Sequence, residues 1–243
     1  MIEAQALSKH FDGRAVLNAV DIRVEEGQIV GIIGRGGGGK SVLIKLLCGL
    51  QVPDAGRVLI DGADLNQMDG LSLAELRNQF GLLFQNNALF DFMNVGENVG
   101  FPLVQLGILN DEEIAERVAM RLTEVDLPGV EMLLPNQLSG GMRKRVALAR
   151  ATIAEPPILL YDDPTAGLDP VTSSKIFKLI ERLHKANGVT VIVGHDVDRM
   201  RAICSHWILI HNSAVHFSGS TEQALTSSDS IVRTYFHGVE VSQ

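Results

Sequence analysis

A glycine-rich run near the N-terminus has the residue types and the spacing that phosphate binding requires. Residues 34–41 are Gly-Arg-Gly-Gly-Gly-Gly-Lys-Ser and fit the pattern G-x-x-x-x-G-K-[ST] at every required position. Glycines let the backbone turn tightly and point successive N–H groups at phosphate oxygens. In such a loop, Lys40 reaches the β- and γ-phosphates, and the hydroxyl of Ser41 binds Mg2+. The expected nucleotide-binding residues are Gly34, Gly37, Gly38, Gly39, Lys40 and Ser41.

The segments on either side of this run favour the same interpretation. Residues 28–33 (QIVGII) form an apolar, β-branched stretch of the kind found in buried parallel strands. Residues 42–50 (VLIKLLCGL) place apolar side chains at helical spacing. The N-terminus of such a helix adds partial positive charge to the loop. A surface loop that matches by chance would need both flanks to be coincidence, so we expect the chain to bind a nucleoside triphosphate.

Polar side chains follow three further apolar runs that read as strands. Gln85 follows FGLLF, the pair Asp162-Asp163 follows ILLY, and His195 follows TVIV and a glycine. Ligands of open parallel sheets bind beyond the carboxyl ends of the strands, where these residues belong. We expect Asp162 to hold Mg2+, Asp163 to orient or deprotonate an attacking water, Gln85 to sense metal or water, and His195 to contact the γ-phosphate. Each residue alone could be an ordinary group at a sheet edge, but the glycine loop makes the joint functional interpretation stronger.

A second glycine-containing turn opens a later helix. Ser139-Gly140-Gly141 would present bare N–H groups at the positive end of the helix, which suits an anion, although an ordinary capped helix fits equally well. The basic run at residues 143–145 is interpreted as a solvated helix face rather than a nucleic-acid site.

Phe11 either packs in the core or stacks on an adenine ring, and the sequence fits both alternatives. Residues 86–103 interleave Phe and Met with Asn and Gly, which favours a docking surface over core.

The elements that must position these residues alternate between strand and helix along the chain. Helix caps are predicted at Ser72 with Glu75 and at Asn110 with Glu113, and a hairpin is predicted around Asn212. The expected strands are residues 2–7, 15–24, 28–33, 57–60, 80–84, 157–161 and 190–193, and the expected helices are residues 42–50, 72–78, 110–125, 139–153 and 171–186, with a hairpin at 207–217 and two short helices after it. This alternation indicates an α/β fold with a mainly parallel sheet.

Composition narrows the possible partners. The 243 residues are 46% hydrophobic and carry a formal net charge of −8, which argues against nucleic acid as the main partner. Cys48 and Cys204 lie in apolar helical contexts and are interpreted as reduced core residues. No stretch approaches the roughly 20 apolar residues of a membrane span, and the N-terminus lacks a signal or transit pattern. For any function at a membrane, we expect a partner protein to provide the membrane-spanning part.

Taken together, these residues resemble the nucleotide-binding subunit of ATP-binding-cassette (ABC) transporters over essentially the whole chain. The likeness assigns residues 34–41 to Walker A, Gln85 to the Q-loop, residues 138–142 (LSGGM, with Met142 in place of Gln) to the signature, residues 158–163 to Walker B, residues 166–169 to the D-loop and His195 to the switch histidine. Phe11 lies where the family has its adenine-stacking aromatic residue. The resemblance implies ATP and Mg2+ as cofactors, a transmembrane permease as partner, and a head-to-tail homodimer. In such a dimer, Ser139, Gly140 and Gly141 contact the γ-phosphate held by the opposite subunit.

The same resemblance implies a domain organisation. The ABC-type P-loop NTPase core has an N-terminal antiparallel β subdomain and an inserted helical subdomain. Carried onto this chain, residues 1–243 form a single ATPase domain, with a core of about 1–85 and 155–243 and a helical subdomain of about 86–154.

A narrower likeness, to the ATPases of Mla/MCE-type lipid transporters, is carried by residues 84–103, by the LSGGM form and by the run Asp-Pro-Val-Thr-Ser at 169–173. It implies phospholipid transport between bacterial membranes, a place on the cytoplasmic face of the inner membrane, and periplasmic MCE and STAS-domain partners. An ATPase for another solute and a slowly hydrolysing switch are the alternatives. Some relatives have a C-terminal extension, and we expect no long one here, because the chain ends soon after residues 235–238.

One position departs from the family pattern. The family usually has Glu after the Walker B aspartate, where this chain has Asp163. A carboxylate one methylene shorter is misplaced by about an ångström, and misplacement on that scale can lower a rate roughly 100-fold. We therefore expect slow hydrolysis with intact ATP binding. Arg35, Gly36 and Gly38 are also unusual, at positions where the loop pattern tolerates variation.

Overall fold

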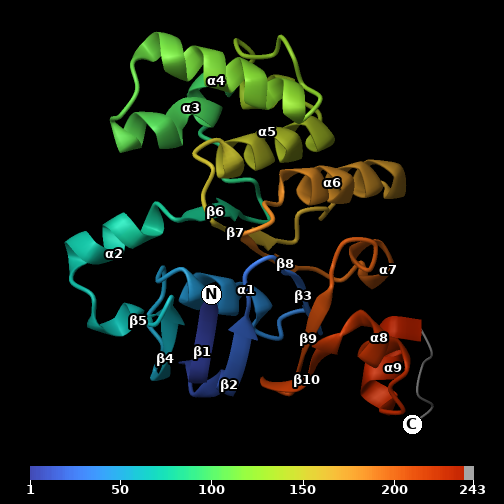
Figure 1. The fold of residues 1–243 in the computed structure, drawn as a ribbon. Coiled ribbons are helices and arrows are strands. Elements are labelled where there is room, and N and C mark those ends of the chain that lie inside the picture. Colours follow the sequence, from blue (N-terminus) through green and yellow to red (C-terminus); the bar gives the residue numbers. More distant parts are fainter. Residues whose placement is uncertain (238–243) are drawn as a thin grey trace. The chain divides into compact units, whose positions relative to one another are not determined.

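The structure is a computed structural model that describes residues 1–237 and divides into two compact units (Figure 1). The first unit combines Met1–Arg77 with the chain from Lys185 on, and the second is Asn78–His184. Residues 238–243, where the sequence predicts no long extension, lie outside the described part of the chain. Within that part, none of the helices combines the length and the apolar character that crossing a membrane requires.

An antiparallel sheet opens the first unit. Its strands are β1 (Ile2–Phe11), β2 (Arg14–Val24), β4 (Ala55–Ile60) and β5 (Ala63–Asp64), in the order β2-β1-β4-β5 (Figure 1). The pairing of β1 with β2 shifts register after Ala4, and Ala6 and Ala19 have positive φ angles of 48° and 46°. At this β-bulge, the Ser8 hydroxyl accepts a hydrogen bond from the Ala19 N–H at 2.9 Å. It also donates to the Ala6 carbonyl at 3.5 Å.

Parallel strands form the second sheet segment of this unit. β3 (Ile29–Gly34) pairs in parallel with β8 (Val189–Val193) and β9 (His206–His211), and β10 (Ala214–Ser220) pairs antiparallel with β9. Every residue of β3 is buried, as the continuous apolar run predicts for a parallel strand. The 212–213 turn has φ angles of 49° and 66° and joins β9 to β10, so the predicted hairpin is confirmed.

The helices of the first unit lie between and after these strands. They are α1 (Lys40–Leu47), the 3-10 turn η1 (Leu65–Gln67), α2 (Gly70–Arg77), α7 (Val197–Met200), α8 (Thr221–Leu225) and α9 (Ser230–His237). The cap predicted at Ser72 is wrong: α2 begins earlier, and the Ser72 N–H donates to the side chain of Asp69 at 2.7 Å. The sequence pattern does not predict α7. Cys48 and Cys204 are buried free thiols, as predicted, and burial raises the pKa of Cys48 to about 11.

The second unit pairs two parallel strands with a set of helices. β6 (Phe80–Leu83) pairs in parallel with β7 (Ile158–Asp162). Between them in the sequence come α3 (Val95–Leu106), α4 (Asp111–Glu124), the 3-10 turn η2 (Pro135–Gln137) and α5 (Gly140–Thr152), and α6 (Pro170–Leu183) follows β7. α3 packs against both α4 and α5 (Figure 1). Asn110 and Glu113 form the predicted capping box of α4.

The α/β fold class predicted from the alternation of elements is confirmed. Parallel strand pairs occur in both units, the N-terminal sheet is antiparallel, and a helical segment is inserted between β6 and β7. Residues 86–103 differ in part from the prediction, because only the loop before α3 is without buried residues. Asn94 and Glu97 cap α3 with a capping box, and α3 buries Val95, Val99 and Leu103.

Candidate nucleotide-binding site

The glycine loop of the first unit leaves β3 and leads into α1. Gly34, Gly37 and Gly39 have φ angles of 154°, 71° and 88°, a region that favours glycine. A Cβ on Gly34 would lie 2.4 Å from the Ile210 carbonyl oxygen, and one on Gly39 would lie 2.7 Å from the Val16 carbonyl oxygen. The loop therefore needs glycine at these two positions for space as well as for conformation.

The ammonium group of Lys40 binds backbone carbonyls of the glycine loop. Its buried Nζ donates to the Gly34 carbonyl at 3.0 Å and to the Arg35 carbonyl at 2.9 Å. α1 begins at Lys40 after the cap residue Gly39, has Ser41 as its second residue, and carries no acidic side chain in its first turn. The positive end of the helix and the lysine thus act together, which is the electrostatic setting of an anion site.

His195 lies at the same edge of the parallel sheet as the glycine loop. β8 runs parallel to β3 with Val193 opposite Ile32, and His195 follows two residues after β8 ends. The side chain is exposed. The first unit therefore brings together two of the predicted site elements, the loop and His195, at the carboxyl ends of neighbouring parallel strands, as open parallel sheets do.

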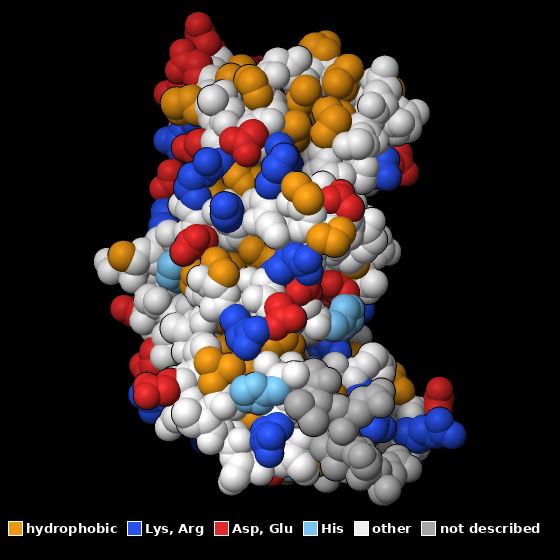
Figure 2. All heavy atoms as spheres, turned by 90° about the vertical axis from the view of Figure 1, so that its right-hand side faces the viewer, with side chains coloured by type: hydrophobic (Ala, Val, Ile, Leu, Met, Phe, Trp, Pro, Cys, Tyr) orange, Lys and Arg blue, Asp and Glu red, His pale blue; other side chains and the backbone are white. Residues whose placement is uncertain are grey.

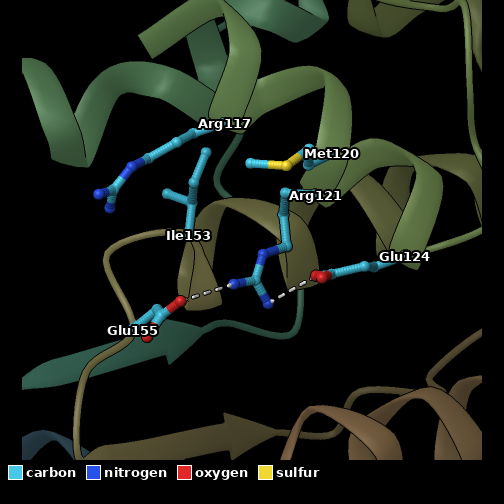
Figure 3. Close-up of a pocket in the computed structure, with 6 residues that line it drawn as sticks. All are labelled: Arg117, Met120, Arg121, Glu124, Ile153 and Glu155. Carbon is cyan, nitrogen blue, oxygen red and sulfur yellow. Dashed lines mark ion pairs between the residues drawn. The ribbon is translucent and has the colours of Figure 1, made fainter. Parts of the chain in front are cut away.

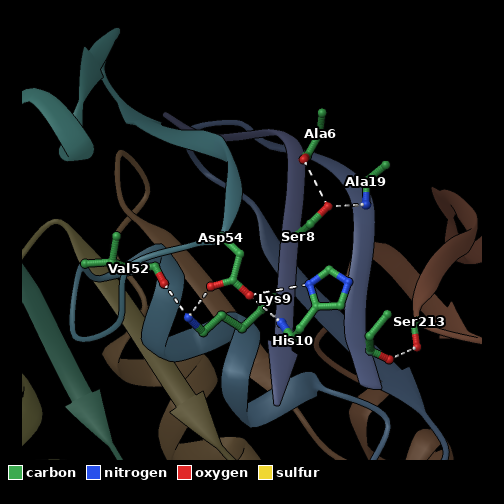
Figure 4. Close-up of polar contacts among 9 residues, drawn as sticks. Ala6, Ser8, Lys9, His10, Ala19, Val52, Asp54 and Ser213 are labelled. Carbon is green, nitrogen blue, oxygen red and sulfur yellow. Dashed lines mark hydrogen bonds and ion pairs between the residues drawn. The ribbon is translucent and has the colours of Figure 1, made fainter. Parts of the chain in front are cut away.

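Phe11 is on the surface, so the core-packing alternative is wrong. It ends β1 with 41% of its area exposed, and Lys9 Nζ lies 5.7 Å from the ring centroid. Asp54 holds this strand end by accepting from Lys9 Nζ at 2.8 Å and from the His10 N–H at 2.6 Å (Figure 4). Hydrogen bonds from Lys9 and His10 lower the pKa of Asp54. The ring is thus presented to solvent on an anchored backbone.

The predicted acidic and amide residues share one edge of the second unit. Asp162 ends β7, Asp163 follows it, and both are buried. Gln85 follows two residues after the parallel strand β6, whose Leu83 is opposite Tyr161. The second unit therefore places Gln85 and the aspartate pair beyond the carboxyl ends of paired strands.

Lys144 is a residue of this edge that the sequence analysis missed. The basic run at residues 143–145 predicts a solvated position for it, yet only 3% of it is exposed. Its Nζ donates to the Gln85 carbonyl at 2.6 Å and to the Asp163 carbonyl at 3.4 Å. Burial lowers the pKa of Lys144, and the charges of Asp163 and Asp162 oppose that shift. No sequence pattern reveals this role, because both acceptors are backbone oxygens far away along the chain.

The predicted anion-binding turn caps α5. The Ser139 hydroxyl accepts from the Met142 N–H at 3.2 Å, so the ordinary cap is present. Ser139 and Gly140 are nevertheless exposed, and the first turn contains no acidic residue. A Cβ on Gly141 would lie 2.9 Å from Thr172 Cγ2. The first N–H groups of a helix lack partners within it, so this end combines a cap with an accessible positive pole.

Aromatic side chains cluster at the start of the helical segment. The Phe90 centroid lies 5.8 Å from that of Phe92 and 5.0 Å from that of Phe101, and the Arg150 guanidinium carbon lies 5.7 Å from the Phe90 centroid. Phe92 is 79% exposed, whereas Asn98 is fully buried and binds the backbone of this loop. On the face drawn in Figure 2, hydrophobic side chains gather over the helical part of this unit. The predicted docking segment therefore combines an exposed aromatic ring with a buried amide.

A cavity of about 340 Å³ lies elsewhere in the second unit, between α4 and the end of α5 (Figure 3). Arg121 lies within it and pairs with Glu124 at 3.2 Å and with Glu155 at 4.0 Å. The lining residues are Arg117, Met120, Arg121, Glu124, Ile153 and Glu155. None of them is a predicted site residue, so this cavity is separate from the predicted nucleotide-binding elements of the second unit.

Comparison with known proteins gives one family. The sequence profile of the ABC transporter family matches residues 17–166. The chain is 36% identical to the intermembrane phospholipid transport ATP-binding protein MlaF of Haemophilus influenzae over 98% of this chain and 90% of that protein. It is 40% identical to the methionine import ATP-binding protein MetN of Clostridium acetobutylicum over 91% of this chain and 69% of that protein.

A solved structure agrees with these sequence matches. A dimeric ATP-binding cassette in a post-hydrolysis state, bound to ADP and Pi, superposes with a TM-score of 0.84 and 31% identity, covering 90% of this chain and 98% of that one. The ABC-type P-loop NTPase fold implied by the motifs is thereby confirmed. The chain belongs to the ABC transporter family, as an ATP-binding subunit that hydrolyses ATP.

Proposed function

We propose that this protein is the ATPase subunit of a bacterial transporter that moves phospholipid between the inner and the outer membrane. The observation that carries the proposal is the likeness to MlaF, which spans 98% of this chain and 90% of the relative. The likeness to MetN is slightly higher in identity but covers only 69% of that protein. An ATPase for another solute is therefore the second candidate.

The residue roles at the nucleotide follow from the chemistry of each group. Backbone N–H groups of the glycine loop, with Lys40, bind the phosphates, and Phe11 stacks on the adenine through its exposed ring. Ser41, Asp162 and Gln85 would hold Mg2+, which would neutralise charge on the phosphates. Mg2+ usually takes one or two carboxylates together with phosphate and water oxygens. The proposed ligands include one carboxylate, that of Asp162, which is buried at the carboxyl end of β7 and fits that preference.

Hydrolysis then needs a base and an orienting group. Asp163 accepts a proton from water as the water oxygen attacks the γ-phosphorus, and the bond to the β-γ bridging oxygen breaks to leave ADP and inorganic phosphate. His195 contacts the γ-phosphate and orients the attack. The carboxylate of Asp163 is shorter than the Glu usual in the family, so hydrolysis is slow. This keeps a regulatory ATP switch as a third candidate.

A second copy of the chain completes the site. Ser139, Gly140 and Gly141 of one subunit contact the γ-phosphate held by the other, because their helix end is exposed and positively polarised. ATP stabilises the closed homodimer because it touches both subunits only in that state. We also propose that residues 1–243 are one ATPase domain, with a core of about 1–85 and 155–243 and a helical subdomain of about 86–154.

The remaining partners are proteins of the membrane system. The surface around Phe92 receives a transmembrane permease, which holds this subunit at the cytoplasmic face of the inner membrane. A periplasmic MCE lipid-binding protein and a STAS-domain protein complete the complex. Nucleic acid is not a partner.

Affinity purification from detergent-solubilised membranes tests this proposal. A tagged wild-type chain and a tagged Phe92→Asp control are purified side by side, and co-eluting proteins and lipids are identified by mass spectrometry. The proposal expects a multispan permease, an MCE-domain protein and bound phospholipid with the wild type, all reduced with the control. A permease accompanied by a soluble solute-binding protein would favour the second candidate. No membrane partner at all would favour the switch.

A further inference from the structure

Lys144 occupies a position that is unusual for a lysine. It lies on α5 between two arginines, yet it is almost completely buried, and a charged group is seldom buried unless it is paired. Its neighbours bind elsewhere: Arg143 donates to the Leu138 carbonyl at 2.7 Å, and Arg145 bonds with Asp126. The three basic residues therefore have different surroundings, and only Lys144 reaches the edge that carries Gln85 and Asp163.

The partners of Lys144 are main-chain atoms of two motifs. Its Nζ donates to the Gln85 carbonyl, 59 residues away in sequence, and to the Asp163 carbonyl, 19 residues away. Hydrogen bonds from an ionised donor are stronger than neutral ones. One side chain thus ties the backbone after β6 to the backbone after β7, independently of the side chains at those positions.

Asp163 needs such support, because its backbone is strained. It has a φ of 49°, which is uncommon for a residue other than glycine and persists only where the surroundings hold it. The Asp163 carbonyl also accepts from the Ala166 N–H at 3.1 Å. The two donors fix the peptide plane, and that plane sets the direction in which the Asp163 side chain leaves the backbone.

We propose that Lys144 is a positioning residue that orients the Asp163 carboxylate for hydrolysis and links it to the Q-loop at Gln85. The inference rests on the proposed function of Asp163 as the base. Lys144 touches the backbone rather than the nucleotide. Its loss therefore lowers the rate of hydrolysis and leaves the affinity for ATP unchanged.

The test compares Lys144→Met, Lys144→Arg and Arg145→Met with the wild type. Methionine matches the length of lysine without its donors, and arginine keeps donors that can reach two carbonyls. For Lys144→Met we expect kcat to fall about 10- to 100-fold, with the Kd for MgATP within about twofold of the wild type. Lys144→Arg recovers part of the rate, and the matched control Arg145→Met keeps the wild-type rate. Melting temperatures establish that each variant is folded.

Several outcomes would overturn the inference. One is a folded Lys144→Met with wild-type kcat, and another is a parallel loss of kcat and affinity, which indicates a merely structural role. If Lys144→Met does not fold, Lys144→Gln carries the same test, because its amide can still donate to one carbonyl. Asp163→Asn tests the proposed base separately, because an unchanged kcat in that variant would refute the role of Asp163 as the base. A Lys144→Met/Asp163→Asn pair that is slower than Asp163→Asn would show that Lys144 acts by another route.

Discussion

The glycine loop and the acidic edge around Asp163 are built in different ways. In the loop, Lys40 binds carbonyls five and six residues away, so the geometry is set within one strand-loop-helix segment. At the acidic edge, Lys144 binds carbonyls 19 and 59 residues away. The glycine loop is local, so its sequence pattern is enough to predict its structure. The acidic edge exists only after β6, β7 and α5 have packed, so its central lysine has no sequence signature.

The same substitution in the two regions gives the sharpest contrast. Lys40→Met should weaken ATP binding roughly 10- to 150-fold, because it removes a charge-assisted hydrogen bond worth about 1.5–3 kcal/mol. Lys144→Met should instead leave binding unchanged and slow hydrolysis. Isothermal titration with a non-hydrolysable ATP analogue measures the first effect. If both variants lost the same affinity for ATP, the glycine loop and the acidic edge would not have the different roles proposed here.

Asp163→Glu tests whether the acidic edge limits the rate. Adding a methylene returns the carboxylate to the length usual in the family, and hydrolysis should become up to about 100-fold faster. Steady-state phosphate release measures it, with Kd for ATP as the control. A Glu variant that is no faster would mean that the backbone of Asp163, with its φ of 49°, already compensates for the shorter side chain.

Phe11→Ala tests the other end of the nucleotide. Loss of an exposed stacking surface should cost about 1 kcal/mol, or roughly fivefold in affinity for ATP. Phe11→Tyr keeps a ring of similar size and serves as the control. Competition between ATP and inorganic triphosphate measures the contribution of the base: the preference for ATP should fall in the Ala variant and persist in the Tyr variant.

Asp54→Asn is expected to have the smallest effect. Hydrogen bonds from Lys9 and His10 hold the pKa of Asp54 below its usual value. A depressed carboxyl pKa stabilises the fold above the unfolded value, about 3.9, and this contribution is lost as pH falls through the folded value. The Asn variant should therefore melt slightly lower at pH 7, and the difference should vanish in acid. A difference that persists in acid would show that the ionised carboxylate is not the cause.

Several local features could be predicted because the residues that decide them are near one another in sequence. Asn110 and Glu113 form their capping box, and the 212–213 hairpin turn has the positive φ angles that such turns need. Where two nearby residues compete for one role, pattern reasoning fails. Asp69 and Ser72 both suit the start of α2, and the observed hydrogen bond from the Ser72 N–H to Asp69 decides for the former.

Burial was the property that sequence predicted least well. Residues 86–103 contain a fully buried amide, Asn98, whose side chain binds the backbone at Phe90, Met93 and Asn94. A polar residue among glycines suggests a surface, but a buried amide with all these partners is satisfied. Phe11 shows the reverse, as an aromatic ring left exposed at the end of an anchored strand.

The sequence by itself determined the α/β class, the phosphate loop and the family, because these depend on periodicity and on motifs only a few residues long. Tertiary structure alone decided that Phe11 is exposed, how far α3 is buried and which backbone carbonyls accept from the buried Lys144. The physical reason is the same in each case. Exposure and backbone hydrogen bonding depend on atoms distant in the chain, and main-chain acceptors leave no trace in the identity of the residues that supply them.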